Sequence, residues 1–266
     1  MSLYNEKNYT IDVPYIFNHY IREYDIAQAN INILFSKGVI NDYLYNQLSN
    51  SDRMIRQVYI GKMIRDNPEI QNILSEGVIE AKQKLFLENE IPDNRILSIK
   101  NDAVFIIGMI PKHTEFGNVR FVHKNTYTSF MKLYSMEVYY GAGMNYEVID
   151  VKGIKDSDLE LYHQDFLGII IDYFRYLQKE GAEAAFHYIT YIINEYVGRK
   201  LPINTYRRFR YSNDFVINGF TEDYGILQIE DNEYNRNAID ISYNLGLLRI
   251  MHTYVSQVLY EEKVRS

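Results

Sequence analysis

The chain has 266 residues, of which 47% are hydrophobic, and it carries a formal net charge of −7. This length permits one large domain or two smaller ones with a hydrophobic core. The absence of cysteine excludes disulfides, thiolate metal sites and cysteine nucleophiles. No signal peptide and no run of the roughly 18 apolar residues that a membrane span requires are recognisable, so a cytoplasmic protein without membrane contact is expected. The net charge argues against nonspecific coating of nucleic acid but permits a localised basic groove.

The segment of residues 24–40 predicts the end of a strand that runs into a helix, and Asp25 is the single acid among its apolar residues. Residues 51–65 follow with four basic side chains at helix-compatible spacings, namely Arg53, Arg56, Lys62 and Arg65. We expect a basic helix face there. Such a face is either simply solvated or binds phosphates.

An amphipathic helix is predicted over residues 69–89, because apolar residues recur at spacings of three and four after Pro68. The next stretch, ILSIKNDAVFII at residues 96–107, places Lys100, Asn101 and Asp102 inside an apolar run. Since Asn-Asp favours tight turns, a strand, a turn and a second strand are expected. Asp102 is then either an ordinary turn residue or a metal-binding carboxylate on a hairpin tip.

The second half of the chain changes character near residue 150. Alternation typical of β structure continues over residues 117–140, whereas residues 156–198 and 240–263 have helical patterns. The sequence therefore predicts an α+β fold. We expect an antiparallel sheet with helices in residues 1–150, and a mostly helical domain in residues 151–266.

Asp25 and Asp102 are the two acids whose surroundings suggest chemistry. Two carboxylates brought together from adjacent strands supply the hard oxygen ligands that Mg²⁺ prefers. A pair of such ions activates a 3′-hydroxyl and stabilises a departing pyrophosphate, which is the chemistry of a polymerase palm. A helix-capping role is the alternative for Asp25.

Two short motifs resemble the palm of DNA polymerases. DIAQANINIL at residues 25–34 resembles motif A of family A polymerases, with Asp25 and Gln28 on matching positions. IKNDAVF at residues 99–105 is similar to motif C, in which a metal-binding aspartate lies on a β-hairpin after a palm helix, and Asp102 matches that ligand.

The order of the later segments is more similar to family B DNA polymerases. Lys124 and Tyr127 resemble a basic-tyrosine motif, and Lys152 with Gly153 resembles the Lys-Gly step that precedes a helical thumb. The resemblance implies a palm-like domain over residues 1–150 and a thumb-like domain over residues 151–266.

This resemblance implies a reduced, viral-type nucleotidyltransferase of DNA replication that binds a primer-template and a nucleoside triphosphate in the host cytoplasm. Asp25 and Asp102 would be catalytic residues and would hold Mg²⁺ or Mn²⁺. The expected nucleotide-binding residues are Gln28, Asn30, Arg53, Arg56 and Lys62, and the expected nucleic-acid-binding residues are Lys124, Tyr127 and Lys152.

A second basic feature is YRRFRY at residues 206–211, in which Arg207, Arg208 and Arg210 alternate with aromatic residues. Arginine contacts phosphates and aromatic rings stack on bases, so a nucleic-acid-binding surface is expected there.

The sequence also supports a rival hypothesis. No fingers motif is recognisable between Asp25 and Asp102, and Ala103 stands where motif C offers a second acid. The alternative is a non-catalytic nucleic-acid-binding subunit or replication accessory protein on a polymerase-like fold. Either hypothesis allows a companion polymerase or replisome chain as a partner that supplies missing functions.

Overall fold

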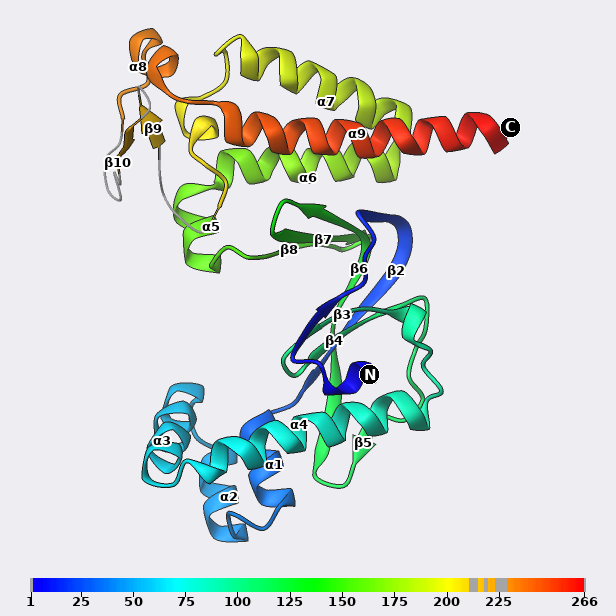
Figure 1. Ribbon diagram of the computed structural model, residues 1–266, viewed down its shortest axis with the longest axis vertical. Coiled ribbons are helices and arrows are strands. Elements are labelled where there is room, and N and C mark those ends of the chain that lie inside the picture. The colour runs from blue at the N-terminus through cyan, green and yellow to red at the C-terminus, as the bar shows by residue number, and fades with distance from the viewer. Residues whose placement is uncertain (1, 211–214, 218–219, 223–228, 266) are drawn as a thin grey trace. The chain divides into compact units, whose positions relative to one another are not determined.

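A computed structural model describes residues 2–210, 215–217, 220–222 and 229–265 (Figure 1). The chain forms two compact units, the first from Met1–Asp12 and His19–Tyr127, the second from Val13–Asn18 and Thr128–Ser266. Strands and helices are combined in both, which confirms the predicted α+β class.

The first unit contains an antiparallel sheet in the order β1, β3, β4, β2, with β6 beside β2 and the short β5 paired with the start of β6. Its strands are β1 Asn8–Thr10, β2 Tyr15–Ile26, β3 Ile96–Lys100, β4 Ala103–Ile107, β5 Glu115–Phe116 and β6 Val119–Leu133. Strands β2 and β6 continue from this unit into the second.

The predicted hairpin is formed by β3 and β4. Lys100 pairs with Ala103, which leaves Asn101 and Asp102 as a two-residue turn. Asn101 has a φ of 55°, a left-handed value that asparagine tolerates better than most residues. Most side chains of both strands are buried, which accounts for the long apolar run in the sequence.

The helices of the first unit are α1 Ala29–Ser36, α2 Asp42–Ser49, α3 Arg53–Asp66 and α4 Glu69–Glu88, with short 3₁₀ turns η1 Leu3–Asn5 and η2 Asp93–Arg95. Helix α1 follows β2 almost directly, as the sequence predicted. The side chains of Asn41 and Asp52 accept hydrogen bonds from backbone N–H groups in the first turns of α2 and α3. Pro68 lies at the start of α4, again as predicted.

Close packing of α4 on α1 requires a glycine at position 77. A Cβ placed on Gly77 would overlap the side chain of Ile33, whereas a Cβ on Gly61 in α3 would meet nothing within 4 Å. We expect Gly77→Ala to lower the free energy of unfolding by about 1–3 kcal/mol through overpacking. Gly61→Ala, its matched control, should raise it by about 0.5–1 kcal/mol through helix propensity. Urea unfolding of both variants measures this, and equal effects would contradict the packing.

The second unit combines an antiparallel meander with helices. It contains the later part of β6, β7 Met136–Gly143, β8 Tyr146–Lys152, α5 Asp156–Tyr162, α6 Gln164–Lys179, α7 Ala182–Val197, η3 Ile203–Tyr206, β9 Phe215–Ile217, β10 Phe220–Glu222, α8 Glu233–Ala238 and α9 Ser242–Arg265. In Figure 1, α6, α7 and α9 lie alongside one another. Within the described residues, no helix combines the length and apolarity needed to cross a membrane.

The division between the units differs from the boundary expected near residue 150. Tyr140 of β7 stacks on Phe174 of α6 with 4.9 Å between ring centroids, and Val151 of β8 belongs to the same buried cluster. Strands β7 and β8 therefore share a core with the helices that follow them.

Candidate functional site

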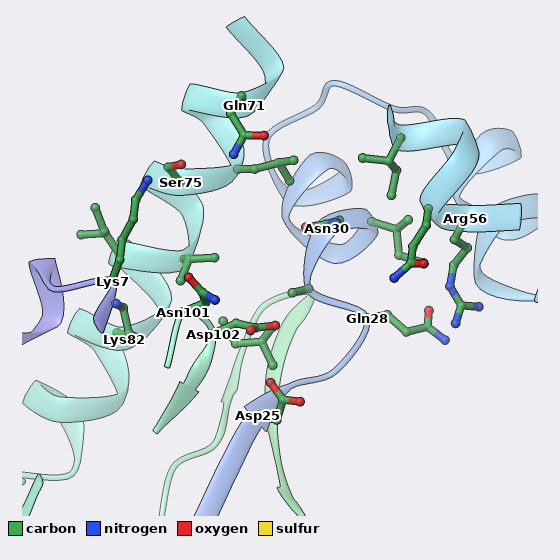
Figure 2. Close-up of a pocket in the computed structure, with 18 of the residues that line it drawn as sticks. Lys7, Asp25, Gln28, Asn30, Arg56, Gln71, Ser75, Lys82, Asn101 and Asp102 are labelled. Carbon is green, nitrogen blue, oxygen red and sulfur yellow. The ribbon is translucent and has the colours of Figure 1, made fainter. Parts of the chain in front are cut away.

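The first unit contains a pocket of about 690 Å³ (Figure 2). It lies at the end of β2 and at the β3–β4 turn, and α1, α3 and α4 contribute residues to its walls. Its lining combines two acids with several cations: Asp25, Asp102, Arg53, Arg56, Lys82 and Lys124.

The structure brings together the two acids that the sequence singled out. Asp25 pairs with Ala103 in the antiparallel register of β2 and β4, so Asp102 is next to the residue opposite it. Figure 2 shows both side chains at the same side of the pocket, Asp25 from the end of β2 and Asp102 from the hairpin turn.

The surroundings of Asp25 favour a cation at this place. Burial raises the pKa of its carboxyl group, and the charges of Asp102 and Glu23 raise it further, whereas Lys124 opposes them. Its Oδ1 atom is buried and has no hydrogen-bond partner within the described part of the chain. A buried, ionised oxygen without a donor is costly, and a divalent cation would offset that cost.

The donor set fits Mg²⁺ or Mn²⁺ bound through few protein ligands. Among the described residues, no group of three or more acids or histidines could hold a metal ion. Mg²⁺ commonly binds one or two carboxylates and completes its shell with water and substrate phosphate oxygens. Asp25 and Asp102 would be the protein ligands in such an arrangement.

Helix α3 contributes part of its predicted basic set to the pocket. Arg53 and Arg56 are among the lining residues, and Arg56 also donates to the carbonyl of Ser51 at 2.5 Å. Lys62 is not a lining residue. It follows Arg53 by about two and a half helical turns, so the two side chains leave the helix on opposite sides. Arg65 pairs instead with Asp66 at 3.3 Å. The four cations therefore do not form one face.

Gln28 and Asn30 lie at the start of α1 and line the pocket, as Figure 2 shows. Gln28 caps the helix with a left-handed φ of 45°. Because α1 begins at the pocket, its first backbone N–H groups offer a partial positive charge to an anion there.

Two lysines of the pocket, Lys7 and Lys82, were missed by sequence reasoning. Lys82 is buried in α4 and donates to the carbonyl of Glu6. Burial lowers the pKa of its ammonium to about 8, while the charges of Glu6 and Asp102 act in the opposite direction. Gln71 and Ser75 also line the pocket, and their spacing from Lys82 places all three on one face of the helix. This polar spacing was the feature of the sequence that could have indicated Lys82.

The basic-tyrosine pair on β6 has two different positions. Lys124 lines the pocket, and its Nζ atom lies 3.6 Å from Oε1 of Glu23 and 4.0 Å from Oδ2 of Asp25. Tyr127 is fully buried, and its hydroxyl donates to Oε2 of Glu23 at 2.9 Å. A ring in this position cannot stack on a nucleic-acid base, so the interpretation of Tyr127 as a nucleic-acid contact is wrong.

The remaining predicted contacts lie in the second unit. Lys152 pairs with Asp150 at 2.6 Å. Arg207 is buried, with its guanidinium carbon 4.2 Å from the ring centroid of Phe215, and Arg208 pairs with Asp240 at 3.3 Å.

The prediction that Arg207 belongs to an exposed nucleic-acid-binding surface is therefore wrong, because its side chain is packed in the interior. Phe209 is buried as well, and Tyr211 lies outside the described residues. Arg210 is partly exposed and borders that stretch.

Fold and site together define an α+β protein whose paired carboxylates lie in a pocket with cationic walls. The family described as Bacteriophage PBS1 gene 130 protein matches residues 1–256, and the chain belongs to this family. It is therefore a phage protein. A search of curated proteins finds no match.

Proposed function

We propose that this phage protein is a template-directed nucleotidyltransferase of the DNA polymerase type, acting in the cytoplasm of the infected host. The observation that carries the proposal is the placement of Asp25, near the end of β2, and Asp102, in the β3–β4 turn, in one pocket that also contains arginine and lysine side chains. Acids alone would bind a cation, and cations alone would bind a phosphate. A reaction between a hydroxyl and a nucleoside triphosphate needs both.

The chain's own residues divide the work in this proposal. Asp25 and Asp102 would hold Mg²⁺ or Mn²⁺, which when bound stabilises negative charge on phosphate oxygens. Arg53 and Arg56 neutralise the triphosphate, and the N-terminus of α1 adds its partial positive charge. Gln28 and Asn30, which line the pocket at the start of α1, contact the nucleotide in this proposal.

Order along the chain supports the same proposal. Strand β2 has Asp25 as its last residue but one and is followed by helices and then by the β3–β4 hairpin, whose turn contains Asp102. Strand β4 of this hairpin pairs with β2. This order agrees with the sequence resemblance to motifs A and C. Lys124 is half-exposed beside Asp25, where it could contact a primer-template phosphate.

Primer extension by the purified protein tests the proposal. A labelled primer on DNA and RNA templates is incubated with deoxynucleotides or ribonucleotides, with and without Mg²⁺ or Mn²⁺, alone and with candidate companion chains from the phage. Extension that requires the divalent ion is expected. Arg53→Gln should raise KM for the nucleotide about tenfold, since one charge-assisted phosphate contact is lost.

Arg65→Gln is the matched control on the same helix, because Arg65 pairs with Asp66 and does not line the pocket. Its KM should equal that of the wild type. Tight primer-template binding without extension under any of these conditions would overturn catalysis and leave the non-catalytic subunit of a replication complex as the explanation.

A further inference from the structure

Glu23 is a buried carboxylate that neither motif includes. It precedes Asp25 by two residues on β2, so the two side chains lie on the same face of the strand. The residue is only 1% exposed. Burying a carboxylate is costly unless hydrogen bonds and a cation compensate it, so its partners indicate what it does.

Within the described residues, the side-chain partners of Glu23 come from a single stretch of β6. Oε2 accepts hydrogen bonds from the Asn125 amide at 2.8 Å and from the Tyr127 hydroxyl at 2.9 Å. The same Asn125 amide is 3.1 Å from the Tyr127 hydroxyl, which ties the two donors together. Oε1 faces the ammonium of Lys124 at 3.6 Å. One oxygen of Glu23 is thus fixed by neutral donors, and the other holds a cation.

Lys124 connects this buried group to the pocket. Its ammonium lies between two carboxylates, 3.6 Å from Glu23 and 4.0 Å from Asp25, while 53% of its side chain is exposed. Its contact on Asp25 is with Oδ2, and Oδ1 of Asp25 is the buried atom without a partner in the described residues. The lysine therefore faces one oxygen of Asp25, and the other, buried oxygen is left without a donor from the described part of the chain.

We propose that Glu23 is a positioning residue that holds Lys124 and shares its charge with Asp25, and that the Lys124 ammonium is the resident cation of Asp25 until a divalent ion binds. The proposal rests on the proposed function, because it assumes that Asp25 and Asp102 bind that ion. Lys124 would then compete with a divalent ion for Asp25, and its flexible side chain, once released from Asp25, would be available to a phosphate.

Mn²⁺ binding to the full chain without nucleotide or nucleic acid tests this role. Binding is measured by electron paramagnetic resonance for the wild type, Lys124→Met, Glu23→Gln and the double variant. The Lys124 ammonium lies 4.0 Å from Asp25 and repels a cation bound there. The Lys124→Met variant should therefore bind Mn²⁺ about fivefold more tightly than the wild type. Glu23→Gln should weaken it, because Lys124 then pairs with Asp25 alone.

The double variant separates anchoring from simple loss of charge. If Glu23 acts through Lys124, Glu23→Gln should change Mn²⁺ affinity less than about twofold once Lys124 is methionine. Equal effects of Glu23→Gln in both backgrounds would overturn the positioning role. Tyr127→Phe, which removes one donor to Glu23 without altering charge, should act in the same direction as Glu23→Gln with a smaller change.

Lys37→Met is the control, since Lys37 does not line the pocket and pairs with Glu80 at 2.6 Å. Its Mn²⁺ affinity should equal that of the wild type. Suppose that the wild type binds Mn²⁺ and extends primers, but folded Lys124→Met binds Mn²⁺ no more tightly than the wild type. This result overturns the role of Lys124 as the resident cation and leaves the proposed function intact. A wild type that binds Mn²⁺ but never extends primers overturns the proposed function alone, and one that binds no Mn²⁺ overturns both.

Discussion

Asparagine in place of Asp25 or Asp102 is expected to lower the rate of primer extension at least about a thousandfold. Each substitution removes a charged ligand from a site that would stabilise several kcal/mol of transition-state charge, and each 1.4 kcal/mol is about a factor of ten in rate. The measurement is the single-turnover rate at saturating nucleotide, so that weaker substrate binding does not contribute. Either variant with the wild-type rate would contradict the two-carboxylate site.

The same change at Asp25 should not weaken the fold of the metal-free protein. Burial and the Asp102 charge raise the pKa of Asp25, so the ionised carboxylate is less favourable in the folded than in the unfolded chain. Its contribution to stability is complete below the unfolded pKa and is lost as pH rises through the folded pKa. Asp25→Asn should therefore make thermal stability less dependent on pH across that window, and at neutral pH it should be at least as stable as the wild type.

Asp93→Asn is the control for the extension rate. Asp93 is exposed in η2 and does not line the pocket, so its removal should leave that rate unchanged. Strong destabilisation by Asp25→Asn would instead indicate that the carboxylate serves the fold.

Local sequence patterns predicted those parts of the site whose structure is itself local. The turn at Asn101 and Asp102 lies between two apolar runs, and an Asn-Asp pair at such a place favours a hairpin whatever surrounds it. Helix α4 has the same character, because its apolar spacing and Pro68 act within one element. The meeting of Asp25 with Asp102 was predicted by resemblance and agrees with the strand register.

Contacts between distant segments could not be read in this way. Glu23 has Tyr127, 104 residues away, as its hydrogen-bond donor, and no local spacing indicates such a pair. Lys82 belongs to a helix with an amphipathic pattern, yet this polar residue is buried against the chain segment at Glu6. Composition likewise changes near residue 150, whereas β7 and β8 pack with α6 because the side chains of both fill one core.

Arg207→Ala is expected to lower the free energy of unfolding of the second unit by about 2–3 kcal/mol. The guanidinium lies over Phe215 at 4.2 Å and near Tyr162 at 5.4 Å, and the side chain is buried. A desolvated cation–π contact is worth about 2 kcal/mol, and truncation also leaves a cavity. Urea unfolding followed by tyrosine near-ultraviolet circular dichroism measures the loss.

Nucleic-acid affinity distinguishes this structural role from a binding role. Measured at a temperature at which the variant remains folded, primer-template affinity of Arg207→Ala should equal that of the wild type, because a buried guanidinium has no access to a phosphate. Arg249→Ala, on the exposed side of α9, is the matched control and should change stability by less than about 0.5 kcal/mol. Wild-type stability together with weakened binding in Arg207→Ala would instead place this arginine on a nucleic-acid surface, against the packing around Phe215.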